Sequence, residues 1–230
     1  MFRRKTCTLQ VLYQACETGD LTKLKKLVKA GIDVNGVSES EENESLNKGE
    51  TPLFVACKEN QREIAEALIG YGADVNRADN QGRSPLYIAC ARGGDTWFTT
   101  SGQYDEWDEL IYMLIKLGAD VNQRADDGTS PLYKCSEFGY INAAKALLDN
   151  GALVDQPTKD GSTSLYNACT EGVDCPPFVE LLIKYKADVN LTMKDGSSLL
   201  DAACQKRSYD IIEMLEANGA AGNQSEDDCE

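Results

Sequence analysis

Ser84-Pro85-Leu86-Tyr87-Ile88-Ala89-Cys90 opens the stretch of sequence that decides the fold, and Leu117-Gly118-Ala119-Asp120-Val121-Asn122 closes it. The opening phrase recurs with small changes from Thr51, Ser130 and Thr163, and the closing phrase recurs at residues 31–35, 72–76 and 187–190. Thr51 and Ser84 are 33 residues apart, as are Ser130 and Thr163. A fixed period of this length predicts a stack of repeated units rather than one compact core.

Each unit carries the signals of two short helices. Thr51 is a good N-cap, and Pro52 suits the first helical position, where its missing N–H leaves no bond unmade. Apolar residues then recur at helical spacing in both halves of the unit. The sequence therefore predicts an all-α solenoid of six units over about residues 9–223, as a single domain.

Several segments interrupt or flank the repeats. Residues 1–8 are expected to form a flexible basic lead, and residues 224–230 an acidic disordered tail. The acidic insert 36–49 has almost no apolar residue and is expected to be a mobile loop. The insert 93–107 contains both tryptophans of the protein. Lys186 replaces the glycine that ends the other second helices, which predicts a strained helix end.

Composition restricts the classes of partner. The chain has 230 residues and a net charge of −15, so it repels nucleic acid and anionic membranes and favours a basic protein partner. No apolar run approaches the ~20 residues of a membrane span, and the start of the chain does not read as a signal peptide. We expect an intracellular protein, cytoplasmic or nuclear.

The chemistry-bearing residues argue against a metal, a cofactor or a reaction. Histidine, the commonest general base and metal ligand, is absent, and the nine cysteines include no Cys-x-x-Cys pair. Cysteine recurs at one position of the repeat, where it is expected to be a small buried apolar residue: Cys16, Cys57, Cys90, Cys169 and Cys204. No phosphate-binding loop and no activated cysteine is evident, so we expect no enzyme and no small-molecule substrate.

The repeated Gly-x-Thr-Pro-Leu-x-x-Ala, the two short helices and Gly-Ala-Asp-Val-Asn resemble the ankyrin repeat. The resemblance covers about residues 9–223 and implies short β-hairpins, each followed by an antiparallel helix pair. It also implies a curved solenoid whose concave face carries the hairpin tips and first helices. The family usually has a histidine after Thr-Pro-Leu that bonds between loops. Its place is taken here by Tyr13, Phe54, Tyr87, Tyr133, Tyr166 and Asp201. These residues leave undecided whether the bond between loops is made, but they do not put the fold in question.

The resemblance implies a non-catalytic protein-binding module, an adaptor, scaffold or inhibitor that acts as a monomer through its concave face. Partner contacts are carried over by analogy to the hairpin tips and first-helix ends, each of which taken singly is ordinarily just a solvated residue. They are Lys58, Glu59, Asn80, Gln81, Arg83, Arg92, Asp126, Asp127, Glu137, Phe138, Lys159, Asp160, Glu171, Lys194 and Asp195.

Aromatic residues give two further hypotheses. Phe138 is typical of an exposed anchor on a binding face, with packing against the neighbouring repeat as the alternative. The insert contains too many aromatics for a disordered linker, so they fold back as a local core, present an interface, or do both: Trp97, Phe98, Tyr104 and Trp107.

A weaker pattern and three functional alternatives remain open. Leu-x5-Asp-Val-Asn, as at Leu27–Asn35, resembles the pattern that asparaginyl hydroxylases modify, but Asp and Asn are also favoured in a simple turn. The alternatives are a free-standing adaptor or inhibitor, a substrate-recognition subunit of a larger complex such as a ubiquitin ligase, and a purely structural or orphan repeat domain cut from a longer chain.

Overall fold

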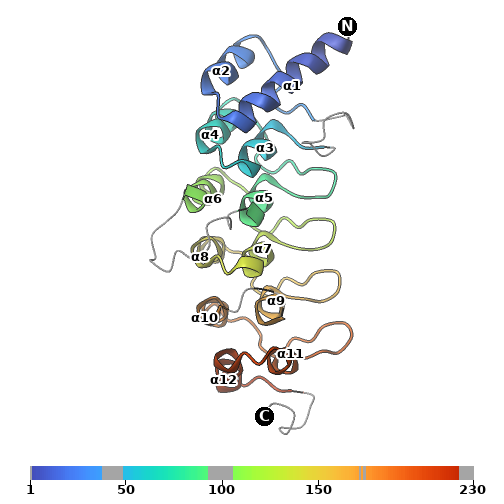
Figure 1. The fold of residues 1–230 in the computed structure, drawn as a ribbon, viewed down its shortest axis with the longest axis vertical. Helices are drawn as coiled ribbons and strands as arrows, with labels where there is room; N and C mark the ends of the chain where they lie inside the picture. Colours follow the sequence, from blue (N-terminus) through green and yellow to red (C-terminus); the bar gives the residue numbers. More distant parts are fainter. Residues whose placement is uncertain (1, 38–48, 93–105, 171, 173–174, 223–230) are drawn as a thin grey trace. The chain divides into compact units, whose positions relative to one another are not determined.

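A computed structural model describes residues 2–37, 49–92, 106–170, 172 and 175–222, with the backbone alone for residues 2–8. The chain divides into two compact units, Met1–Asp126 and Asp127–Glu230. Each unit consists of three helix pairs stacked one on another (Figure 1). The boundary falls between the third and fourth repeats of the sequence.

The first unit has two layers of helices. The first helices of its repeats are α1 (Phe2–Thr18), α3 (Pro52–Lys58) and α5 (Pro85–Arg92), and the second helices are α2 (Leu21–Lys29), α4 (Arg62–Gly70) and α6 (Glu106–Lys116). Within each layer consecutive helices pack side by side, and each first helix packs on its own second helix (Figure 1). Each repeat therefore packs on its neighbour along the chain, as in a solenoid.

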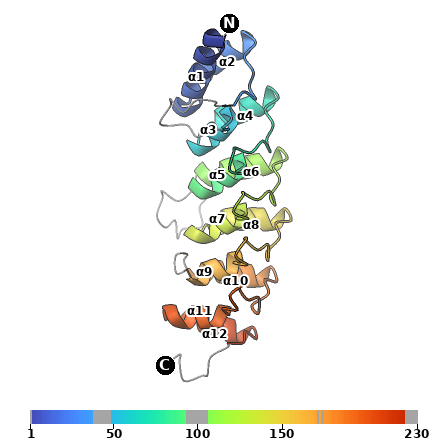
Figure 2. The ribbon, with the colours of Figure 1, turned by 90° about the vertical axis from the view of Figure 1, so that its right-hand side faces the viewer.

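The second unit repeats this arrangement. Its first helices are α7 (Pro131–Phe138), α9 (Ser164–Thr170) and α11 (Leu199–Lys206), and its second helices are α8 (Ile141–Asp149), α10 (Pro176–Lys184) and α12 (Tyr209–Ala217). Helix α9 packs between α7 and α11, and α10 packs between α8 and α12 (Figure 2). Both units confirm the helical stack predicted by the 33-residue period.

The same cap starts the first helices. The Thr51 hydroxyl accepts a hydrogen bond from the N–H of Phe54 at 3.1 Å, and Ser130 does the same for Tyr133. Pro52 and Pro131 follow these caps at the start of α3 and α7. The motif Thr/Ser-Pro-Leu is thus a helix start: the hydroxyl satisfies a free N–H while proline has none to satisfy.

Between the two layers of each unit lies an apolar core. Cys16, Cys57, Cys90 and Cys169 occupy one position of four repeats and are all buried, as the sequence predicts, whereas Cys204 is half-buried. Burial, with a smaller contribution from Glu17, raises the pKa of the Cys16 thiol to about 12. The Cys16 thiol therefore remains neutral, and the buried cysteines act as small core residues.

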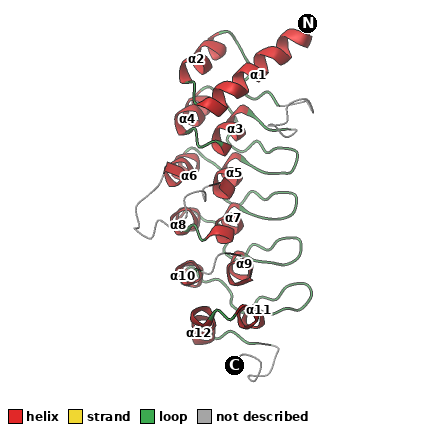
Figure 3. Ribbon diagram, viewed as in Figure 1, coloured by secondary structure: helices red, strands yellow, loops and turns green. Residues whose placement is uncertain are grey.

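The connections between repeats differ from the expected β-hairpins. No strand occurs in the part of the chain that the structure describes, and the connections are loops (Figure 3). In the loop before α5, for example, the chain reverses its direction, and a backbone hydrogen bond runs from the N–H of Asp79 to the carbonyl of Arg83 at 3.0 Å. The Asp79 carboxylate takes the N–H groups of Gln81 and Arg83, so these donors are not available for a strand ladder.

The ends and inserts can be compared only in part. The sequence predicts a flexible lead over residues 1–8, but α1 begins at Phe2, because this stretch has neither glycine nor proline to stop the helix. Residues 38–48 and 93–105 and the tail 223–230 lie outside the described residues. The expected loop character of both inserts and the expected disorder of the tail therefore stay predictions.

Asparagine side chains join neighbouring repeats. Asn35 donates to the carbonyl of Gly72 at 2.9 Å and accepts from the N–H of Asp74 at 2.9 Å. Asn76 makes the same two bonds with the next repeat, and so does Asn190 in the second unit. These three asparagines thus each supply a two-point bridge, which satisfies one backbone donor and one backbone acceptor of the following repeat.

One junction departs from this bridge at both of its ends. Asp155 stands where the other repeats have asparagine, and its carboxylate accepts the N–H of Asp188. A carboxylate has no N–H, so it cannot donate the second bond, which the Asn35 amide donates to the carbonyl of Gly72. The residue equivalent to Gly72 at this junction is Lys186, which has a backbone φ of 69°. The strained helix end predicted at Lys186 is confirmed.

Replacing Lys186 by glycine should stabilise the protein by about 1 kcal/mol, because glycine adopts a positive φ without a steric penalty. Urea unfolding followed by circular dichroism measures the change. Lys184→Gly, in the last turn of α10, is the matched control and should destabilise by about 1 kcal/mol. Equal effects of the two substitutions would show that the backbone at Lys186 is unstrained.

Replacing Asp155 by asparagine should restore the second bond and stabilise the protein by about 1 kcal/mol near neutral pH. Burial raises the pKa of Asp155, the N–H of Asp188 lowers it by less, and the Asp188 carboxylate adds to the rise. The folded protein therefore holds this proton more tightly than the unfolded chain, and wild-type stability falls as pH rises from the ordinary value of 3.8 through the raised pKa.

Unfolding of wild type and Asp155→Asn at several pH values tests this sign. The stability advantage of the variant should be small in acid and grow toward neutrality. Asn76→Asp is the reverse substitution, made at an intact bridge, and it should destabilise the protein. A variant with wild-type stability at every pH would contradict the assigned role of Asp155.

Candidate functional site

The residues predicted to contact a partner lie in two kinds of place. Those at the loop tips are Asn80, Gln81, Arg83 and Asp126 in the first unit and Asp127, Lys159, Asp160, Lys194 and Asp195 in the second. Those at the ends of first helices are Lys58, Glu59, Arg92, Glu137 and Phe138. Glu171 lies outside the described residues.

Backbone bonds hold neighbouring loop tips together. The N–H of Asp126 donates to the carbonyl of Gln81 at 2.8 Å in the first unit. In the second unit Lys159 donates to Asp127 at 3.1 Å, and Lys194 donates to Asp160 at 3.2 Å. The exposed side chains at these tips therefore stand on an ordered backbone, which reduces the entropy lost when a partner binds them.

Arg83 is turned toward its own protein. Its guanidinium donates to the Asp79 carboxylate at 2.5 and 2.7 Å and lies 5.5 Å from the centre of the Phe54 ring. The Arg83 side chain is 21% exposed and that of Asp79 is fully buried. This arrangement joins the loop of the third repeat to the second repeat through an ion pair and a cation–π contact.

Lys58 is also engaged within the first unit. Its ammonium lies 3.7 Å from the carboxylate of the buried Glu50, and its side chain is only 15% exposed. Glu59, Asn80, Gln81 and Arg92 are exposed, by contrast. In the first unit the structure therefore brings two of the predicted residues into internal contacts and leaves others facing solvent.

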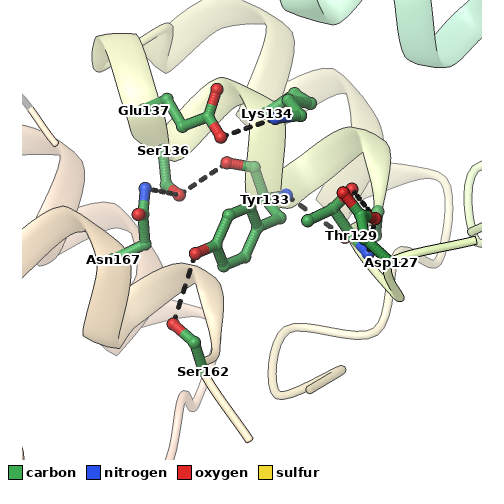
Figure 4. Close-up of polar contacts among 9 residues, drawn as sticks. Asp127, Thr129, Tyr133, Lys134, Ser136, Glu137, Ser162 and Asn167 are labelled. Carbon is green, nitrogen blue, oxygen red and sulfur yellow. Dashed lines mark hydrogen bonds and ion pairs between the residues drawn. The ribbon is translucent and has the colours of Figure 1, made fainter. Parts of the chain in front are cut away.

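Tyrosine at the usual histidine position does restore a polar link between repeats. The Tyr13 hydroxyl lies 2.6 Å from the carbonyl of Glu50 and 3.0 Å from that of Gly36. The Tyr133 hydroxyl lies 3.4 Å from that of Ser162 (Figure 4). The open question from the sequence is thereby answered for these two junctions: the phenol reaches the loop of the next repeat.

Charged and polar side chains interact with one another in the fourth repeat, before and along α7. The Lys134 ammonium pairs with Glu137 at 2.6 Å, and the Thr129 hydroxyl and N–H bond to Asp127 (Figure 4). Burial tends to raise the pKa of Asp127, but the Thr129 bonds and the nearby Lys134 outweigh it, so the pKa lies below its usual value. Asp127 is therefore an ionised, oriented carboxylate at neutral pH.

A buried polar contact links the fourth and fifth repeats behind this face. The amide of Asn167 donates to the Ser136 hydroxyl at 2.9 Å, and Ser136 donates to the carbonyl of Tyr133 at 2.7 Å (Figure 4). Lys134 and Asn167 are not among the residues that the sequence predicts to contact a partner. Their signal was a polar residue at the position that holds Val55 and Ile88 in the preceding repeats.

Phe138 ends α7 and remains 44% exposed. Its ring stacks on Tyr140 of the same repeat, with ring centres 5.3 Å apart and an interplanar angle of 15°. Gly139 between them has a φ of 71° and turns the chain toward α8, whose first residue, Ile141, is exposed as well. Phe138 is thus a preoriented aromatic with apolar neighbours, of which Tyr140 and Ile141 were not anticipated.

The aromatic insert is only partly visible. Trp97, Phe98 and Tyr104 lie outside the described residues, so neither hypothesis for them is tested. Trp107 lies in the first turn of α6 and is half-buried, rather than forming the end of a loop.

Two searches of the described residues bear on other kinds of site. No group of three or more Cys, Asp or Glu side chains that could hold a metal ion occurs among them. Within the same residues, no helix combines the length and the apolar character that crossing a membrane requires.

Comparisons with known proteins agree with the repeat architecture. A family model of ankyrin repeats in three copies matches residues 12–98 and 151–226. The Escherichia coli (strain K12) ankyrin repeat protein YahD is 27% identical over 210 residues, which cover 90% of this chain and 94% of YahD. Protein phosphatase 1 regulatory subunit 27 of Mus musculus is 37% identical over 71 residues, which cover 31% of this chain and 41% of that subunit.

Substituting Arg83 by methionine should destabilise the protein by about 2 kcal/mol, because it leaves the buried Asp79 carboxylate without its counter-charge and Phe54 without its guanidinium. Chemical denaturation measures the effect. Arg92→Met, at the exposed end of α5, is the control and should change stability by less than about 0.5 kcal/mol. If both variants behave alike, Arg83 has no structural role and returns to the set of free surface residues.

Proposed function

Since the chain belongs to the ankyrin-repeat family, we propose that it is a non-catalytic module that binds another protein through its loop tips and first-helix ends. It acts as an adaptor, scaffold or inhibitor. The observation that carries the proposal is Phe138, an exposed aromatic held in place by Tyr140. An aromatic side chain that is already oriented offers a large apolar contact at a small loss of conformational entropy.

The second unit supplies the rest of the binding face. The exposed Lys159, Asp160, Lys194 and Asp195 lie at its loop tips, next to the starts of the first helices, whereas Phe138 ends α7. A partner that contacts Phe138 and the loop tip of Asp127, which precedes α7, spans the length of this helix, about 12 Å for eight residues. This geometry suits an apolar anchor at one edge and a polar, adjustable edge at the loop tips.

The net charge of the chain supports a basic partner, and its cysteines support an intracellular compartment. A net charge of −15 favours a partner with a basic surface and speeds its association. Cys16, Cys57 and Cys90 are buried and form no disulfide bond, which fits a reducing intracellular compartment. Burial raises the pKa of Cys57 as well as that of Cys16, so these two thiols are poor nucleophiles, in keeping with a module that binds rather than catalyses.

A second candidate is a recognition subunit within a larger complex. It is favoured by the similarity of 71 residues to a mouse protein named a regulatory subunit of protein phosphatase 1. As such a subunit, the chain binds the target of the complex through the same loop tips and first-helix ends. Recovery of a phosphatase or of ubiquitin-ligase components with the chain would favour it over the free-standing adaptor.

Affinity capture from lysate tests the proposal. Phe138→Ala should reduce retention of the specific partner at least about tenfold, because an aromatic anchor contributes roughly 2 kcal/mol or more. Tyr209→Ala is the matched control: Tyr209 is 63% exposed but starts a second helix, α12, outside the proposed face. The control should bind as wild type, and both variants should keep the wild-type melting temperature.

Two results would contradict the proposal. A partner lost with Tyr209→Ala and kept with Phe138→Ala places binding on the second helices. Failure of the wild type to retain any specific protein at low salt removes the support for an independent binding module.

A further inference from the structure

A hollow lies between the fifth and sixth repeats, inside the second unit. It is lined by Tyr166 of α9, by Asp195 and Ser197 of the following loop, and by Asp201 and Gln205 of α11. Its volume is about 260 Å³. Pockets that enclose small-molecule ligands are typically about 300–1,000 Å³, so this hollow suits a single side chain better than a cofactor or metabolite.

The equivalent place in the first unit already holds a guanidinium. Phe54 lies three residues after the cap Thr51, and Arg83 lies one residue before the next cap, Ser84. The guanidinium of Arg83 sits 5.5 Å from the Phe54 ring centre and is held by Asp79. The junction of an aromatic residue with the following loop can therefore accommodate an arginine head, and in this repeat pair the protein provides it from its own chain.

At the hollow, the same register has an aromatic ring but no arginine. Tyr166 lies three residues after the cap Thr163 and so corresponds to Phe54, while Ser197 precedes the cap Ser198 and so corresponds to Arg83. The short serine side chain leaves the space that the longer arginine fills in the first unit. Met193 occupies the register of Asp79, and two other carboxylates line the hollow instead, those of Asp195 and Asp201.

The lining is suited to a cation. Hydrogen bonds from the N–H and then the hydroxyl of Ser197 lower the pKa of Asp195, which is therefore ionised at neutral pH and held in a fixed orientation. Asp201 adds a second carboxyl group, Gln205 an amide, and Tyr166 an aromatic ring, and none of the residues that line the hollow is basic. A planar guanidinium can stack on a ring while it donates to carboxylates in its own plane, which a lysine ammonium cannot do.

We propose that this hollow binds an arginine side chain of the partner protein, in the place that Arg83 occupies at the equivalent junction of the first unit. The inference rests on the proposed function, because it names one side chain of the partner that the second unit recognises. It adds a specific contact at the sixth repeat to the apolar anchor at Phe138 and gives the preference for a basic partner a structural basis.

Titration with N-acetylarginine amide, followed by backbone amide chemical shifts in NMR spectra of the full chain, tests the proposal. Saturable shifts are expected at Ser197 and Gln205, with an affinity in the millimolar range. N-acetyllysine amide carries the same charge and should bind at least about threefold more weakly, because it lacks the planar fork of donors.

Three variants locate the site. Ser197→Arg supplies the guanidinium from the protein itself, as Arg83 does, and should abolish saturable binding. Asp201→Asn keeps the side-chain shape and should weaken binding about threefold or more by removing one carboxylate. Glu213→Gln is the matched control: it removes an exposed carboxylate from α12, a second helix of the same repeat outside both the hollow and the proposed binding face, and should leave the affinity unchanged.

The outcomes separate this inference from the proposed function. Shifts that are equal for the arginine and lysine amides, or that fall equally with Glu213→Gln and Asp201→Asn, would show diffuse electrostatic attraction and overturn the site. An absence of saturable shifts would overturn it as well, and Phe138-dependent capture of a partner would then leave the proposed function standing. Arginine-specific binding together with a partner that ignores Phe138 would support the hollow while contradicting the wider binding face.

Discussion

The contact between an aromatic ring of one first helix and the loop of the next repeat is the interaction on which the stacking of these repeats depends. A single helix pair cannot bury its own apolar face, so each repeat needs its neighbour in a definite register. Tyr13 sets that register by reaching the carbonyl of Glu50, Tyr133 by reaching Ser162, and Phe54 by stacking with Arg83. Two different chemistries, a phenol hydrogen bond and a cation–π contact, thus perform one structural task at one position of the repeat.

Much of this architecture is predictable because its causes are local. The cap of Thr51 and the ring of Pro52 act within one helical turn, and the apolar spacing of the helices follows from 3.6 residues per turn. The position of the buried cysteines follows from the period alone. Residues 2–8 were harder, because a basic polar segment gives little apolar signal although nothing in it prevents a helix from continuing.

The candidate site was less predictable because it depends on contacts between repeats. Arg83 reads as a solvated loop residue in the sequence, and only the fold brings it over Phe54 and against Asp79, whereas Phe138 reads as exposed and is exposed. The stacking of Phe138 on Tyr140 depends on the left-handed turn at Gly139, which no periodicity argument contains. Likewise the hollow beside Tyr166 arises from what Ser197 lacks, and that is visible only when two junctions are compared in three dimensions.

The junction between the fourth and fifth repeats departs from the rules that the other junctions follow. Asp155 and Lys186 replace an asparagine and a glycine at the two ends of one bridge, so a bond is lost at the same place where a backbone conformation is strained. Natural proteins tend to keep such local conflicts where they serve function. Phe138 belongs to the fourth repeat, and the hollow lies between the fifth and sixth. A partner that contacts both therefore crosses this junction, and its binding free energy adds to the stability of the second unit where a bond between repeats is missing.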